Sequence, residues 1–173
     1  MMKNARLLIL LILLLLGGST LAADLVESQV KQVIAGDIYK LKYQGTIVPA
    51  RLIGVNLPKE KKKKTADADY FYNPELAGKA KILAIQKLLA GQNVYLEFDR
   101  ARRDRDGYLL VYLWLDKEAT EMFNEILLRE GYGRLKVVRP NIRYEKRLTE
   151  ASQEAEKMGR GIWETTERSI RRN

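Results

Sequence analysis

Residues 30–55, VKQVIAGDIYKLKYQGTIVPARLIGV, decide the fold of this chain. β-branched and aromatic residues gather in three stretches of this segment, which are 30–34, 38–43 and 47–55. The pair Gln44-Gly45 predicts a tight turn that joins the second and third stretches into a hairpin. Gly36-Asp37 predicts a bend or bulge between the first two. The segment is therefore expected to form three neighbouring antiparallel strands.

Two further strands and three helices are predicted from the rest of the chain. The strands are expected over 94–98 and 108–114, which makes five strands in a tight meander. Helix caps and apolar periodicity predict helices over 74–89, over 120–130, and from just after Pro140-Asn141 to 158. Trp163 is expected to fill the core just beyond the last helix. The pattern as a whole predicts an α+β fold that is mainly β.

The first 22 residues have the pattern of a signal peptide. Lys3 and Arg6 precede ten unbroken Leu and Ile residues, and Thr20-Leu21-Ala22 places small side chains before a cleavage point at Ala23. The apolar run is shorter than the roughly 20 residues that span a bilayer. We expect export to the periplasm or the exterior and no stable membrane insertion after cleavage, with an uncleaved anchor as the alternative. The chain then divides into a signal peptide at 1–22, one domain at 23–163 and a polar tail at 164–173.

The amino-acid composition restricts the partners, catalytic groups and metal sites that this domain can have. The formal net charge is +9, of which the signal peptide supplies two, so the rest of the chain carries +7. This charge predicts a polyanionic partner such as nucleic acid, bound without sequence specificity. The chain has no Cys and no His, which excludes thiol catalysis, imidazole bases and the usual zinc sites. Any bound metal would have to be a hard cation with oxygen ligands. We also expect the protein to be a monomer.

Six motifs in order along the chain resemble the staphylococcal nuclease (thermonuclease) family. They are VIAGD at 33–37, RLIGVNLP at 51–58, NPELA at 73–77, DGY at 106–108, Asn124, and GRGIW at 159–163. The resemblance covers residues 33–163 and implies an OB-fold barrel of five strands that carries three α-helices. It also implies hydrolysis of DNA and RNA phosphodiesters with one bound calcium ion.

The resemblance implies a metal site at Asp37, where the family has its first metal-binding carboxylate. The second carboxylate position falls on Asn56, whose amide offers a carbonyl oxygen but no charge. With one charged ligand missing, Ca²⁺ is expected to bind weakly. The alternative is that Asp37 is simply a turn residue after Gly36.

The catalytic positions that the resemblance implies are also partly substituted. Arg51 occupies the first arginine position. The glutamate position falls on Lys59, with Glu60 one residue later, and the second arginine falls on Tyr108. A general base contributes about 10²–10⁴ in rate and a transition-state arginine roughly 10³–10⁵, so hydrolysis is expected to be absent or very low. The alternatives are that Arg51 pairs with a carboxylate such as Glu75 and that Tyr108 is a packed strand residue.

Basic residues near the expected site are candidates for binding a phosphate backbone. They are Lys59, Lys61, Lys62, Lys63, Lys64, Arg102, Arg103, Arg105 and Lys136. Charge runs are often no more than solvated loops. Three functions therefore remain open: a polyanion-binding protein with little hydrolysis, an active calcium-dependent nuclease in which Glu60 and Arg103 or Arg105 substitute for the lost groups, and a non-enzymatic structural or protein-binding domain.

Overall fold

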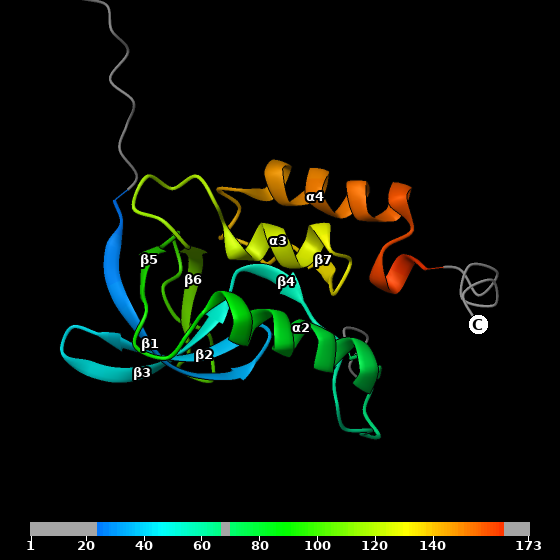
Figure 1. Cartoon of the computed structure of the whole chain (residues 1–173), viewed down its shortest axis with the longest axis horizontal. Coiled ribbons are helices and arrows are strands. Elements are labelled where there is room, and N and C mark those ends of the chain that lie inside the picture. Colours follow the sequence, from blue (N-terminus) through cyan, green and yellow to red (C-terminus); the bar gives the residue numbers. More distant parts are fainter. Residues whose placement is uncertain (1–23, 67–69, 165–173) are drawn as a thin grey trace, which may run out of the picture.

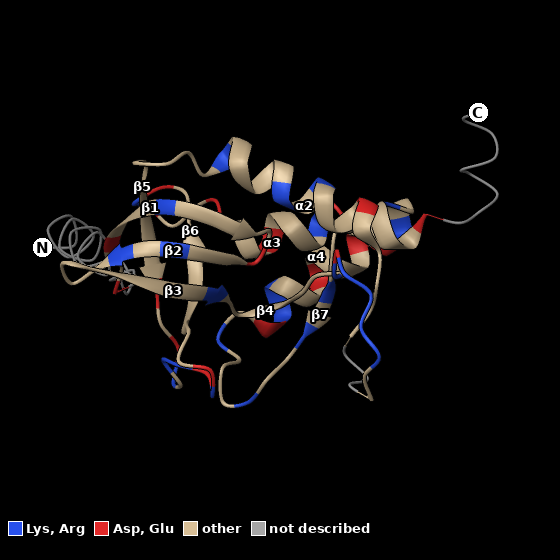
Figure 2. Cartoon of the chain, turned by 90° about the horizontal axis from the view of Figure 1, so that it is seen from below, with Lys and Arg blue, Asp and Glu red and all other residues tan. Residues whose placement is uncertain are grey.

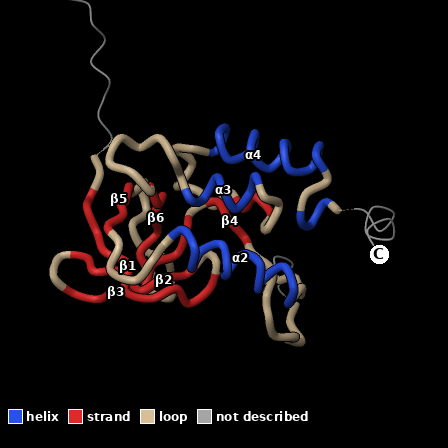
Figure 3. The backbone as a smooth tube through the Cα atoms, viewed as in Figure 1, coloured by secondary structure: helices blue, strands red, loops and turns tan. Residues whose placement is uncertain are grey.

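A closed five-stranded barrel forms the centre of the computed structural model, which describes residues 24–66 and 70–164 (Figure 1). Its strands are β1 (Val26–Ala35), β2 (Ile38–Tyr43), β3 (Thr46–Leu52), β5 (Asn93–Glu97) and β6 (Leu109–Trp114). Three α-helices lie to one side of the strands (Figure 3). The predicted α+β fold, an OB-type barrel with three helices, is confirmed. The predicted signal peptide at 1–22 and the tail beyond Glu164 lie outside the described residues.

The order of the strands differs from the predicted tight meander. The barrel order is β1-β2-β3-β6-β5, so β3 lies beside β6 and pairs with it in parallel. A parallel pair needs a crossover segment, and here helix α2 (Pro74–Lys87) carries the chain from the end of β3 across the barrel to β5. The meander prediction was therefore wrong for the last two strands, because sequence neighbours were assumed to be spatial neighbours.

The hairpin strands form as their alternation predicts. Tyr39, Leu41 and Ala50 are completely buried, whereas Lys40, Lys42 and Pro49, which alternate with them along β2 and β3, are exposed. β1 begins four residues earlier than the predicted start at Val30. The inward side chains of these strands build the apolar core that holds the barrel.

The predicted strand over 47–55 is divided in the structure. β3 ends at Leu52, and β4 (Gly54–Asn56) leaves the barrel to pair with β7 (Arg134–Lys136) in a separate two-stranded sheet. Gly54 has φ +80°, and a Cβ there would collide with the Leu148 side chain of helix α4 (Glu145–Met158). The left-handed backbone and the close helix make the chain turn at this point. This turn directs Asn56 away from the barrel wall.

The three helices begin and end at residues with clear physical reasons. The Asn73 side chain accepts the Leu76 N–H at 3.0 Å, so α2 starts as predicted. α3 (Phe123–Arg129) is shorter than predicted, because the Asp116 carboxylate holds the backbone N–H groups of Thr120 and Glu121 in a preceding turn. α4 (Glu145–Met158) ends at Gly159, which adopts the left-handed conformation.

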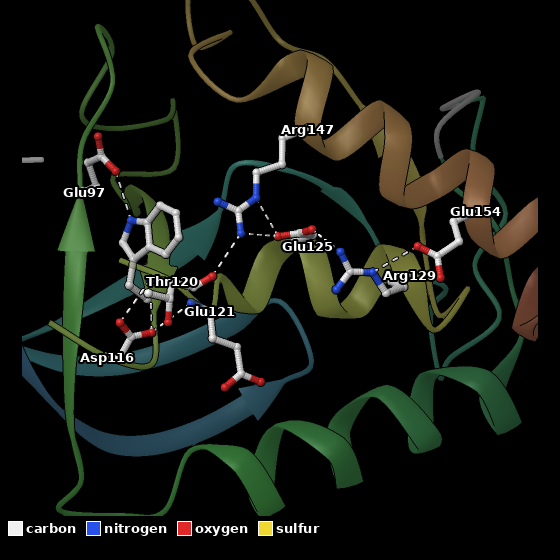
Figure 4. A network of polar contacts seen from close by, with 9 residues as sticks. Glu97, Asp116, Thr120, Glu121, Glu125, Arg129, Arg147 and Glu154 are labelled. Carbon is white, nitrogen blue, oxygen red and sulfur yellow. Dashed lines mark hydrogen bonds and ion pairs between the residues drawn. The ribbon is translucent and has the colours of Figure 1, made fainter. Parts of the chain in front are cut away.

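Polar contacts join α3 to α4 and to the barrel. Glu125 of α3 accepts from Arg147 of α4 at 2.7 Å and also pairs with Arg129, as Figure 4 shows. Buried Asn124 accepts the Leu113 N–H at 2.9 Å and donates to the Ile53 carbonyl at 2.8 Å. These bonds satisfy backbone groups that the strand break would otherwise leave unpaired.

The predicted core position of Trp163 is wrong. Trp163 belongs to a 3₁₀ turn, Gly161–Trp163, in which no residue is buried. Ile162 donates its N–H to the Gly131 carbonyl at 2.8 Å, which holds the turn against the end of α3 rather than inside the barrel. Among the described residues, no helix has the length and apolarity that crossing a membrane requires.

Candidate nucleic-acid interface

A pocket of about 320 Å³ lies at the end of β3, beside the strand break. We call it the β3 pocket, and its polar lining includes Asp37, Arg51, Asn56, Lys59, Asp104 and Lys136. Five of the residues predicted for the site therefore lie together, although they come from the β1–β2 bend, β3, β4, the following loop and β7. Tyr108, Glu60, the other lysines of the loop and the three candidate arginines of the 102–105 turn do not line this pocket.

Asp37 is both a turn residue and a wall of the β3 pocket. Its carbonyl accepts the Leu52 N–H at 3.0 Å, and the residue is only 5% exposed. Burial raises the pKa of its carboxyl, and the positive charges of Lys59 and Arg51 partly oppose that rise. Asp37 is thus a turn residue, as the alternative had it, and its carboxyl also lines the pocket.

Arg51 is held by three groups. Its guanidinium forms an ion pair with Asp104, lies 3.6 Å from the Asp106 carboxylate, and stacks over the Tyr108 ring with the carbon 4.3 Å from the ring centre. Arg51 does pair with a carboxylate, but Glu75 was the wrong candidate, because Glu75 pairs with Lys79 at 2.6 Å. Tyr108 takes part in the site by supporting Arg51.

The sequence interpretation missed Asp104. Its carboxylate also accepts the backbone N–H groups of Asp106 and Tyr108, at 3.0 and 2.9 Å, so the turn itself fixes it in place. The signal available in the sequence was an Asp that opens a short turn ending in Gly107. Nothing local to that turn indicated that it would face Arg51.

Lys59 differs from the lysines that follow it. Its N–H donates to the Phe71 carbonyl at 2.9 Å, and its carbonyl accepts the Asn73 N–H at 3.3 Å. The residue is half-buried, whereas Lys61, Lys62, Lys63 and Lys64 are exposed. The paired backbone therefore fixes the main chain of Lys59 beside the β3 pocket, which its side chain lines, whereas the side chains of the other four lysines lie in solvent.

Glu60 does not reach the β3 pocket. It is exposed and lines a second pocket of about 270 Å³, which shares Asp37 and Lys59 with the β3 pocket. A general base must lie within hydrogen-bonding reach of the water that it activates. In this structure Glu60 and Arg51 line different pockets, which does not favour Glu60 as the replacement base.

The arginines of the turn at 102–105 make their contacts with residues close to them in the sequence. Arg102 stacks on Phe98 with 5.0 Å between the guanidinium carbon and the ring centre, and Arg103 donates to the Gly107 carbonyl at 2.6 Å. Arg105 is exposed. The turn approaches the β3 pocket through Asp104 rather than through an arginine, so a binding contribution from these three arginines stays a prediction.

The donor set at Asp37 does not fit a calcium ion. Calcium takes six to eight oxygen ligands, several of them charged. In the β3 pocket Asp37 is accompanied by the neutral amide of Asn56, while Asp104 is paired with Arg51. Lys59 supplies a positive charge where the cation would need a negative one. Among residues 24–66 and 70–164, no cluster of three acidic side chains could hold a metal.

Comparison with known proteins identifies the family. The family described as "Staphylococcal nuclease homologue" matches residues 49–165. The thermonuclease of Staphylococcus hyicus is 37% identical over 135 residues, covering 78% of this chain and 74% of the relative. The thermonuclease of Staphylococcus intermedius is 38% identical with the same coverage, and the SPbeta prophage-derived endonuclease YokF of Bacillus subtilis is 29% identical over 142 residues, covering 81% of this chain and 45% of the relative. The chain belongs to the staphylococcal nuclease family.

Proposed function

We propose that this protein is exported, binds single-stranded nucleic acid or another polyanion without sequence specificity, and hydrolyses phosphodiesters very slowly or not at all. The observation that carries the proposal is the fixed position of Lys59. Its backbone pairs with Phe71 and Asn73, and its side chain lines the β3 pocket close enough to Asp37 to act on that carboxyl, at the position where the resemblance implies a glutamate. An ammonium group attracts a phosphate but cannot take a proton from water at neutral pH.

The charges of the β3 pocket support phosphate binding. Arg51, Lys59 and Lys136 line it from three separate segments of the chain. Arg51 is paired with Asp104, so a phosphate that binds there competes with that carboxylate for the guanidinium. Binding of this kind depends on charge and reads no base edge, which supports the absence of sequence specificity.

The same residues argue against efficient hydrolysis. A phosphodiester gains negative charge in the transition state and needs an activated water. Asn56 and Tyr108 are uncharged where the family has a carboxylate and an arginine, and the calcium that would activate the water lacks a fitting donor set. A missing general base costs about 10²–10⁴ in rate, and a missing transition-state arginine costs roughly 10³–10⁵. Because such groups act as a unit, their losses are not simply multiplied.

Digestion of single-stranded DNA with and without calcium tests the proposal, alongside a binding titration with the same DNA. We expect tight, salt-sensitive binding in both conditions and no cleavage above background. Arg51→Ala should weaken binding without altering the fold. Strong calcium-dependent cleavage that disappears in Glu60→Gln would instead identify an active nuclease with a rearranged loop. Absence of binding at low salt would favour a structural or protein-binding domain.

Export is tested separately on secreted material. The small residues of Thr20-Leu21-Ala22 favour cleavage before Ala23. N-terminal sequencing should therefore begin at Ala23. Recovery of the protein in the membrane fraction with Met1 intact would show that the segment is kept as an anchor.

A further inference from the structure

The loop between β5 and β6 places a carboxylate on the guanidinium of Arg51, inside the β3 pocket. Cations and carboxylates follow one another closely along this loop, as its blue and red segments in Figure 2 show. Asp104 belongs to the loop, lines the pocket and pairs with Arg51. Carboxylates and phosphates both bind a guanidinium through their oxygen atoms. Asp104 therefore occupies N–H donors of Arg51 that a phosphate would use.

The two carboxylate oxygens of Asp104 have separate partners. Oδ1 accepts the backbone N–H groups of Asp106 and Tyr108, at 3.0 and 2.9 Å, whereas Oδ2 accepts from Arg51. The backbone of the turn thus holds the carboxylate through the oxygen that does not face the guanidinium. The side chains of Arg51 and Asp104 are 31% and 18% exposed, so water can reach Oδ2 when the ion pair opens. A ligand can displace Oδ2 from Arg51 while the turn keeps its own hydrogen bonds.

Arg51 has a second support that a phosphate would not replace. Its guanidinium carbon lies 4.3 Å from the centre of the Tyr108 ring. A cation above an aromatic ring is attracted to the face of the ring, and this contact leaves the N–H donors in the guanidinium plane available. The ring therefore orients Arg51 both with and without its carboxylate partner. The main effect of the ion pair is to occupy the donors, since the orientation of Arg51 has this other cause.

We propose that Asp104 is an internal competitor that lowers the affinity of the β3 pocket for phosphate. This inference rests on the phosphate binding proposed above for that pocket. Because Asp104 and Arg51 belong to one chain, the competing carboxylate has an effective concentration that dilution of the protein does not lower. A ligand must gain attraction elsewhere to displace it, and Lys59 lines the same pocket. Asp104 thus sets how strong a phosphate ligand must be to engage Arg51.

Asp104→Asn tests this competition, with inorganic phosphate as the probe. The amide oxygen of asparagine still accepts the two N–H groups of the turn, whereas the NH₂ group that replaces Oδ2 cannot accept from Arg51. Asp104→Ser, which also keeps an acceptor for the turn, is a second variant with the same expectation. Asp106→Asn is the matched control, because it removes the same charge from the same turn and its exposed carboxylate lies 3.6 Å from the guanidinium.

NMR titration with phosphate at low salt measures the dissociation constant for each protein, and melting temperature verifies that each variant folds. We expect Asp104→Asn to bind phosphate about tenfold more tightly than the wild type, which corresponds to about 1.4 kcal/mol. Asp106→Asn should gain about twofold at most, because exposed charge pairs contribute little. In an Arg51→Ala background, Asp104→Asn should produce no gain, since the carboxylate acts through that guanidinium.

Other results would overturn the inference in distinguishable ways. Equal gains in Asp104→Asn and Asp106→Asn, or a gain that persists in the Arg51→Ala background, would reduce the effect to the net charge of the turn. Weaker binding in Asp104→Asn would show that the carboxylate positions Arg51 for its ligand. Equal phosphate binding by wild type and Asp104→Asn removes the competitor and leaves the proposed function intact. If neither protein binds phosphate or a thymidine oligonucleotide, the proposed function and the inference fail together.

Discussion

Asp37 shows at the residue scale how burial links charge to stability. Burial raises the pKa of its carboxyl above the ordinary 3.8. The folded state therefore holds the proton more tightly than the unfolded chain, and the ionised form destabilises the fold at neutral pH. This cost disappears as the pH falls through the raised pKa, so the fold gains stability from this group on acidification.

Asp37→Asn should raise the melting temperature at pH 7, because it removes a buried charge whose desolvation outweighs the attraction of Lys59 and Arg51. At pH 3 the natural carboxyl is protonated as well, and the difference should vanish. Thermal unfolding at several pH values measures both effects. An equal shift at pH 3 and pH 7 would assign the change to packing rather than to ionisation.

The substituted catalytic positions lead to a second residue-scale prediction. Asn56→Asp, Lys59→Glu and Tyr108→Arg together should produce measurable calcium-dependent cleavage of single-stranded DNA. Each change alone should yield at least roughly 10²-fold less, because a base is ineffective without the metal and the charged cradle around the phosphate. The triple variant with Asp37→Asn serves as the inactive control. Full activity in any one single variant would contradict this view of the site.

At the element scale, α2 depends on a single cap. Asn73→Ala removes the acceptor for the Leu76 N–H and should cost about 1 kcal/mol. For a domain of this size that corresponds to a fall of about 2–4 °C in melting temperature. Asn73→Ser keeps a side-chain acceptor and should retain most of the stability. An equal fall in both variants would show that the side-chain acceptor of residue 73 is not what stabilises the start of α2.

Elements were predictable from sequence where their cause is local. The Asn73 cap and the Gln44-Gly45 turn act on neighbouring residues, so the start of α2 and the hairpin appear where they were predicted. The strand break before Gly54 was not predictable, because the side chain that leaves no room for a Cβ at this position is Leu148, which lies 94 residues later in the chain. The parallel pairing of β3 with β6 likewise depends on how α2 crosses the barrel.

The residues of the candidate site were likewise predictable only where the cause is local to the sequence. Asp37, Arg51 and Asn56 were identified because they lie inside recognisable motifs. The partnership of Arg51 with Asp104 joins residues 53 positions apart, and several acidic residues were plausible partners. The half-buried state of Lys59 depends on pairing with Phe71 across a loop. Such long-range contacts carry no signal in a single sequence.

At the scale of the whole molecule, the lysine loop is expected to extend the field of the β3 pocket. Replacing Lys61, Lys62, Lys63 and Lys64 with Ser should lower the slope of log K against log salt for single-stranded DNA by up to about 2.8, at about 0.7 for each lost contact. The fold should remain intact, because all four side chains are exposed. An unchanged slope and affinity would show that these lysines are only solvated.

The paired backbone at Lys59 has a further consequence for how this protein can change. Because Lys59 bonds to Phe71 and Asn73, the loop between them is closed at its base, independently of what lies at its tip. The entropy of closing such a loop rises only slowly with length, by about 0.6 kcal/mol for each doubling. Insertions and deletions in this loop should therefore change the free energy of folding only slightly. The loop is a natural place for evolution to vary ligand preference, and for an engineer to graft a foreign peptide, while the barrel stays unaltered.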